Sequence, residues 1–281
     1  MLSALLALAA SLTYGVADYL GGLATRRTGV LAVVTLSQGV GLVLLCAAAP
    51  VAGGVVGRGD LLWGAAAGLA GGLAVTLFYR ALAMGRMSIV APVTAVCGLA
   101  VPVIVGLALG ERPGRLALGG VFLAAASVAL LGPGAEPAAP APDVHAGGGA
   151  QPGLRAEPGR AFVTAIAAGV IIGAFYVTLE RTSAAAGLWP LLVARVVSVS
   201  VFLATAAVLH ARGGRPLAIP RAALSTVIGA GVLDVLANAL YVYAVRGGLL
   251  SIVAPLASLY PASTVLLARA RDGERLSRLQ T

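Results

Sequence analysis

The sequence is poor in charge. Of its 281 residues only 10% are charged, lysine is absent, and all 19 basic residues are arginine. Soluble domains are about 25% charged on average, so this chain has too few polar side chains to cover a water-facing body. The composition all but excludes a soluble enzyme and indicates a protein that lies mostly in lipid.

Cysteine and histidine are also scarce, with two residues of each type. Cys46 and Cys97 lie in separate apolar blocks, and two isolated cysteines make neither a disulfide framework nor a metal site. The sequence contains no phosphate loop, paired metal-ligand motif or nucleophile elbow. We therefore expect no cofactor, no metal, no catalytic residue and no ATP-driven pumping by this chain. A membrane enzyme would need a clustered site of that kind.

The basic residues do not form a nucleic-acid site. The net charge is +9 and the pI about 10.5, yet the arginines stand singly or in pairs between apolar blocks. The positive-inside effect accounts for such a distribution, so we expect no nucleic-acid partner. Abundant Arg, Ala, Gly and Pro without Lys suggests a GC-rich bacterial gene. The predicted location is therefore the inner membrane of a bacterium, with lipid around a multipass protein.

Long apolar blocks dominate the chain. A bilayer core requires roughly 20 apolar residues per helix. The first block continues through Tyr14 to Leu20 without a basic leading segment, so we interpret it as a retained helix rather than a signal peptide. Nine blocks of this kind are expected, near residues 2–24, 30–50, 61–84, 88–109, 115–132, 161–180, 188–210, 222–245 and 249–269.

Residues 133–160 interrupt this pattern. They are rich in Pro, Gly and Ala and contain few side chains that could pack. We expect a flexible linker outside the membrane. It divides the chain into a first half over 1–132 and a second half over 161–281.

The two halves resemble each other. The motif SIVAP occurs at Ser88–Pro92 and again at Ser251–Pro255, 163 residues later, and a GER motif recurs at the same offset. With an offset of 158, Gly15 matches Gly173. An ordered series at a nearly constant offset indicates an internal duplication. Five helices per half place the halves in opposite orientations, which is a transporter architecture. The counterpart of the fifth helix would be a tenth, and the sequence contains none.

These features together resemble the drug/metabolite transporter superfamily in its EamA-type branch. The residues that carry the resemblance are the duplicated SIVAP and GER motifs and the stretch Tyr14–Arg27. It implies an all-α multipass bundle of two inverted five-helix repeats that exports or exchanges small metabolites, often amino acids or their analogues, or drugs. It also implies both termini in the cytoplasm, whereas the arginine distribution places the N-terminus outside.

The eighth block carries polar residues at its centre. Asp234 and Asn238 are four residues apart and therefore share one helix face. An ionisable group at this depth costs roughly 2.5–3.5 kcal/mol on insertion scales, so it needs a partner or a wet site. Asp234 is a candidate for binding substrate or a coupling proton. The alternative is a structural ion pair or a helix–helix hydrogen bond.

The seventh block carries Arg195, which could pair with Asp234 or bind a carboxylate or phosphate. It could also extend toward the nearer interface. The matching place in the first half holds Ser37 and Gln38. Together, Arg195 and Asp234 would suit a zwitterion such as an amino acid, although they could simply neutralise each other.

Other polar side chains could join the same site. Asp18 lies late in the first block, and its alternative role is an interfacial carboxylate or a pair with a nearby arginine. Tyr14 and Tyr241 could line the site, with Tyr176 and Tyr260, although tyrosine near an interface is more often a membrane anchor.

Two functional hypotheses follow. The first is a secondary-active transporter that works by alternating access, as a monomer or homodimer, with a small-molecule substrate bound by Asp234, Asn238, Arg195, Gln38, Asp18, Tyr14 and Tyr241. The second is a non-transporting membrane assembly partner or a degenerate remnant, which the absent tenth helix suggests.

Overall fold

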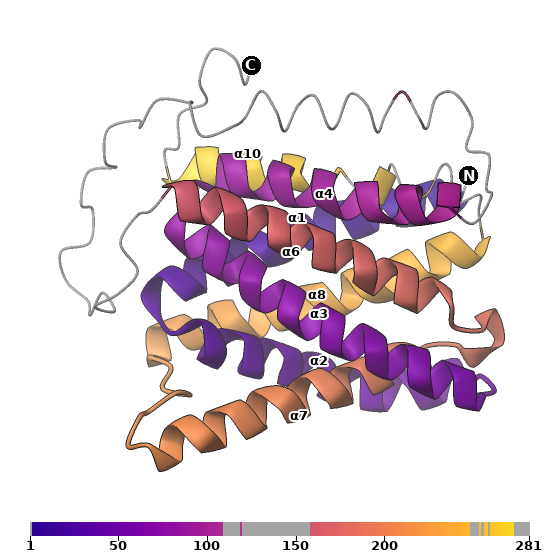
Figure 1. Cartoon of the computed structure of the whole chain (residues 1–281), viewed down its shortest axis with the longest axis horizontal. Helices are drawn as coiled ribbons and strands as arrows, with labels where there is room; N and C mark the ends of the chain where they lie inside the picture. Colours follow the sequence, from indigo (N-terminus) through magenta and orange to yellow (C-terminus); the bar gives the residue numbers. More distant parts are fainter. Residues whose placement is uncertain are drawn as a thin grey trace.

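The computed structural model is a bundle of long α-helices (Figure 1). It describes residues 2–108, 119, 158–247, 253, 256–257 and 259–272, and these include no strand. The elements are α1 (Leu2–Arg27), α2 (Val30–Ala52), α3 (Arg58–Met84), α4 (Met87–Ala108), α6 (Pro158–Glu180), the 3₁₀ turn η1 (Ala184–Ala186), α7 (Trp189–Ala211), α8 (Arg221–Gly247) and α10 (Tyr260–Asp272).

Six of these helices are long and apolar enough to cross a membrane, namely α1, α2, α3, α6, α7 and α8. The all-α multipass class is thereby confirmed. In α4, residues Met87–Pro102 form a shorter apolar helix. The predicted fifth block, apart from residue 119, lies outside the described residues, as do linker residues 133–157. The full count of nine spans stays a prediction.

The linker predicted over 133–160 ends earlier in the structure, because its last three residues belong to helix α6. Helix α6 begins at Pro158, because proline is well accommodated in the first turn of a helix, where its missing N–H has no intrahelical partner. In the predicted ninth block, α10 begins at Tyr260, immediately before Pro261. Pro261 therefore lies in the first turn of α10, where proline is well accommodated.

The bundle has two ends with different charge. Thr28, between α1 and α2, donates its hydroxyl to Ala218 O between α7 and α8 (3.0 Å), which places those connections at one end. At the opposite end Val55 N donates to Ala185 O (2.9 Å), which joins the α2–α3 and α6–α7 connections. We call the first the Arg-rich end, since the helix ends and connections there carry Arg26, Arg27, Arg80, Arg86, Arg160, Arg212, Arg215, Arg221, Arg269 and Arg271. The Arg-poor end carries Arg58, Arg181 and Arg246.

The helices before and after the undescribed central segment are interleaved. Helix α1 packs along α8, and α3 packs along α6 and α7. Helix α4 packs on α6, while α10 packs on α1. The core therefore lies between the halves, and neither half could bury its apolar faces in the same way without the other.

Small residues set the distance between α3 and α7. A methyl group built on Gly64 would lie 3.0 Å from Pro190 O, and one on Gly68 would lie 2.8 Å from the Ala194 Cα. Gly72 faces Ser198 in the same way. These glycines therefore form a small face at which α3 and α7 approach closely.

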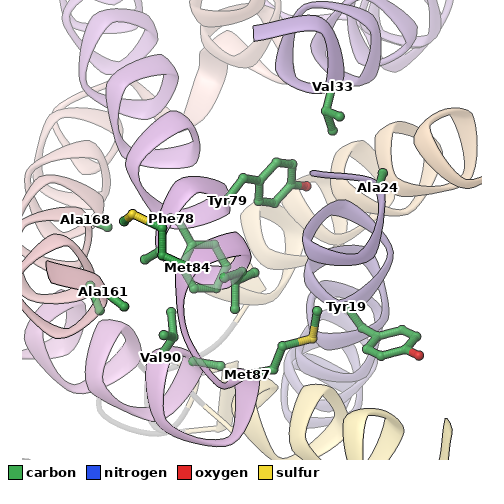
Figure 2. Close-up of a cluster of buried hydrophobic side chains, with 14 of the residues drawn as sticks. Tyr19, Ala24, Val33, Phe78, Tyr79, Met84, Met87, Val90, Ala161 and Ala168 are labelled. Carbon is green, nitrogen blue, oxygen red and sulfur yellow. The ribbon is translucent and has the colours of Figure 1, made fainter. Parts of the chain in front are cut away.

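A large apolar cluster lies among α1, α3, α4 and α6 (Figure 2). Phe78, Met84, Met87 and Val90 are its larger members. Within it, the Tyr79 ring extends from α3 onto Gly21 of α1, where a methyl group would overlap the ring. This cluster anchors α3 against α1 and so fixes the position of the Tyr79 hydroxyl.

Candidate functional site

An ion pair joins α7 to α8. The Arg195 guanidinium donates through Nη2 to Asp234 Oδ2. The side chains are only 12% and 21% exposed. Asn238 Nδ2 donates to the Asp234 backbone carbonyl (2.8 Å), and Ser198 Oγ donates to the Arg195 carbonyl (3.2 Å). Of the three possibilities that the sequence leaves for Arg195, namely a pair with Asp234, an anionic ligand and the membrane interface, the structure shows the pair.

Helix α2 packs closely against this pair. A methyl group on Gly41 would lie 3.4 Å from Arg195 Nε. Gly231 of α8 packs on the backbone of Ser37, where a methyl group would lie 2.9 Å from the Ser37 Cα. Ser37 and Gln38 are both 3% exposed. Gln38 is therefore buried on α2.

Asp18 of α1 lies close to the ion pair. Its carboxylate interacts electrostatically with Asp234 and with the hydroxyls of Tyr176 and Tyr260. Among the described residues Asp18 has no ion-pair partner, because the Arg195 guanidinium is bound to Asp234. The carboxylates of Asp18 and Asp234 therefore lie within electrostatic reach of each other.

Tyrosines surround these charges. The Tyr14 and Tyr260 rings meet edge to face, with centroids 6.4 Å apart. The Tyr176 and Tyr241 rings are 5.3 Å apart. The Tyr14 hydroxyl is buried and, in the described ranges, has no hydrogen-bond partner. It interacts electrostatically with Asp234, Arg195, Tyr176 and Tyr241, so the four rings lie around one group of charges.

Tyr79 belongs to the same group, and sequence reasoning missed it. It is 2% exposed and interacts electrostatically with Asp18, Asp234 and Arg195. Its chain neighbour Arg80, in contrast, is exposed. The signal that could have found Tyr79 is Gly21, which follows Asp18 by one turn of α1 and leaves room for a ring.

We call this group the polar cluster. The structure brings six of the seven sequence-predicted site residues into it or against it, and Gln38 lies on the adjacent face of α2. Its members are Tyr14, Asp18, Tyr79, Tyr176, Arg195, Asp234, Asn238, Tyr241 and Tyr260.

The polar cluster offers three kinds of chemistry. Arg195 can bind a carboxylate with two parallel hydrogen bonds, Asp18 can hold a proton or a cation, and the tyrosine faces can contact an apolar or cationic group. Carboxylates, hydroxyls and one guanidinium are poor ligands for a soft metal. The described residues hold no group of three or more His, Cys, Asp or Glu suited to a metal ion.

A comparison with protein families finds one match in the first part of the chain. Residues 1–132 match the model of the EamA-like transporter family. They include α1 to α4, which supply Tyr14, Asp18 and Tyr79 to the polar cluster. No curated protein sequence matches the chain. The resemblance carried by the SIVAP and GER motifs is confirmed over the matched residues. The chain is therefore a multipass helical membrane protein whose residues 1–132 match the model of the EamA-like transporter family.

Proposed function

We propose that the chain is a secondary-active transporter that exports or exchanges a small metabolite or drug by alternating access. The observation that carries this proposal is the Arg195–Asp234 pair with Asp18 beside it, at the place where helices of both halves meet. Ionisable groups inside a membrane bundle are costly and mark solute or proton pathways.

We also propose that the bundle consists of two inverted repeats with nine spans. Equivalent helix pairs support the repeat, since α1 packs on α8 as α6 packs on α3. The matched glycines support it too. A methyl on Gly15 would meet Tyr260 O and Ser263, and one on Gly173 would meet Gly98 O and Val101. Tyr260 follows Gly98 by 162 residues, and Ser263 follows Val101 by the same number. The two glycines therefore contact corresponding positions of the two halves.

The charges of the polar cluster suit a zwitterionic, amino acid-like substrate. In the described conformation Arg195 and Asp234 neutralise each other. A substrate with a carboxylate and an ammonium group can replace both halves of this pair at once, so neither buried charge is left without a partner. A singly charged substrate that replaced one partner of the pair would leave the other without a partner.

Asp18 supports a second role, the binding of a coupling proton, because no cation among the described residues pairs with it. We expect Asp18→Asn to lower solute-driven proton movement into proteoliposomes at least tenfold, since an amide cannot take up and release a proton. A pH-sensitive dye inside the vesicles measures this movement. Counterflow exchange of the same solute should continue in the variant and serves as the control. Unchanged proton movement in Asp18→Asn would assign the proton to another group.

The setting is proposed to be a bacterial inner membrane, with the Arg-rich end in the cytoplasm. Helix α1 begins at the Arg-poor end (Figure 1), so this orientation places the N-terminus outside. Labelling of an introduced cysteine at Ala184, which is exposed at the Arg-poor end, by an impermeant reagent on intact cells tests it. Labelling only after the cells are broken would reverse the orientation.

The first test of function compares the medium of cells that express the wild type with the medium of cells that express Asp234→Asn. We expect one solute class to accumulate outside only with the wild type. Both proteins must be present in the membrane in equal amounts. If the two media match under that condition, the export proposal fails, and import or the role of an assembly partner becomes the better hypothesis.

A further inference from the structure

Asp60 lies at the Arg-poor end and binds two connections that belong to different halves. Its Oδ2 accepts a hydrogen bond from Gly57 N (2.8 Å), and its Oδ1 accepts one from Ser183 N (2.6 Å). The residue is 6% exposed. Gly57 precedes α3, whereas Ser183 lies between α6 and α7.

Capping of α3 explains only the first of these bonds. Asp60 is the third residue of α3, and its carboxylate accepts from the N-cap amide of Gly57, which is half of a capping box. This bond lies entirely within the α2–α3 connection and the first turn of α3. The bond to Ser183 N reaches 123 residues along the chain. It adds nothing to the α3 cap, but it ties the α2–α3 connection to the α6–α7 connection.

The backbone around Asp60 is shaped for this contact. Gly54 (φ 129°) lies against Ala186, and a methyl group there would come within 2.8 Å of the Ala186 carbonyl carbon. Gly187 (φ 56°) lies against Gly53 O. Such φ values are costly for residues other than glycine. Arg246 Nη2 donates to Gly187 O (2.7 Å) and holds the second connection from α8.

The carboxylate distinguishes this end from the other. Under the proposed repeat, with its offset of 163 residues, Val55 at the Arg-poor end corresponds to Ala218 at the Arg-rich end. The carbonyl of Ala218 accepts a hydrogen bond from the Thr28 hydroxyl. The connections therefore meet at both ends. The counterpart of Asp60 is Ala223 (60 + 163), which has no acceptor side chain. Bonds to an ionised carboxylate are about twice as strong as neutral ones.

We propose that Asp60 is the latch of a gate at the Arg-poor end: its bond to Ser183 N holds the two halves together there, and its release opens a path from that side to the polar cluster. This inference rests on the proposed transport function. It assigns the described conformation as closed at the Arg-poor end.

Two substitutions break the latch in different ways. Asp60→Asn removes the charge and leaves one acceptor oxygen for the two N–H donors of Gly57 and Ser183, and Ser183→Pro removes the donor N–H. Ser183 has φ −63°, which proline adopts without strain. The matched control is Ser183→Ala, which loses the same hydroxyl and its bond from Ala185 N but keeps the donor that binds Asp60.

The readout is the distance between spin labels measured by electron paramagnetic resonance in purified, reconstituted protein. One pair is placed at Val51 and Ala184 of the Arg-poor end, and another at Arg27 and Leu217 of the Arg-rich end, all of them exposed positions. Cys46 and Cys97, both free thiols, are replaced by Ser and Ala. Melting temperatures show whether each variant is folded.

We expect Asp60→Asn and Ser183→Pro to raise the ratio of long to short distances for the Val51–Ala184 pair roughly tenfold. Ser183→Ala and the Arg27–Leu217 pair should stay as in the wild type. Unchanged Val51–Ala184 distances in both folded variants would overturn the latch. If both variants fail to fold, the latch is tested with a disulfide cross-link between cysteines introduced at Val55 and Ala185. Solute flux at the wild-type rate after cross-linking would then overturn the latch.

The outcomes separate this inference from the transport function itself. Longer distances in the variants without any solute flux in the wild type would keep the latch and remove the transporter. Solute flux in the wild type together with unchanged spin-label distances in the variants would keep the transport function and remove the latch.

Discussion

Replacing Arg195 by Met or Asp234 by Leu is expected to destabilise the protein by about 3–5 kcal/mol, because each single change leaves one mostly buried charge without its partner. Both single variants should also lose solute flux. The double variant Arg195→Met/Asp234→Leu should recover most of the lost stability, since a buried ion pair replaced by apolar side chains of similar volume is often neutral or stabilising. It should not recover flux.

Two measurements separate these effects. Unfolding followed by circular dichroism in detergent gives the stability of each variant, and proteoliposomes give the flux. The exchanged pair Arg195→Asp/Asp234→Arg is a further control, because it keeps both charges but reverses their positions. A double variant that transports at the wild-type rate would show that the pair is purely structural, and it would remove Arg195 and Asp234 from the substrate site.

Gly68→Leu is expected to prevent the correct assembly of the bundle. The first carbon of the new side chain would lie 2.8 Å from the Ala194 Cα and 2.9 Å from the Val197 Cβ, so α3 and α7 would have to separate. Overpacking typically costs about 1–3 kcal/mol and sometimes more. Here the cost falls at the upper end, because the obstacle includes the backbone of α7. The same displacement would move Arg195, which follows Ala194.

The matched control is Gly39→Leu on α2, where a methyl group would have no neighbour within 4 Å. Both variants add the same side chain to a glycine inside an apolar helix, so helix propensity and hydrophobicity change equally. Size-exclusion chromatography of the detergent-solubilised protein is the measurement. We expect a monodisperse peak for Gly39→Leu and aggregate, or loss of the protein, for Gly68→Leu. Equal peaks would show that the α3–α7 contact is not required for assembly.

The polar cluster shows how far sequence reasoning reaches. Asp234 and Asn238 were assigned to one face because the helical period requires it, and Asn238 does bond back to the Asp234 carbonyl. The partner of Arg195 was left open between Asp234, a substrate and the interface, since a single helix cannot indicate which neighbour it will face. Tyr79 was missed because its role depends on Gly21 of another helix.

By itself the sequence determined that this protein is a multipass helical bundle and located its six long apolar helices, because span length and apolar composition are local properties that the bilayer imposes. Its motifs also pointed to the family whose model residues 1–132 match. Only the tertiary structure decided that α1 lies on α8 and α3 on α6, that Arg195 pairs with Asp234, and that Asp60 joins two connections 123 residues apart. The physical reason is that such contacts depend on which small residues let two helices approach. The hydrophobic periodicity and composition of one helix do not indicate which other helix it will pack against.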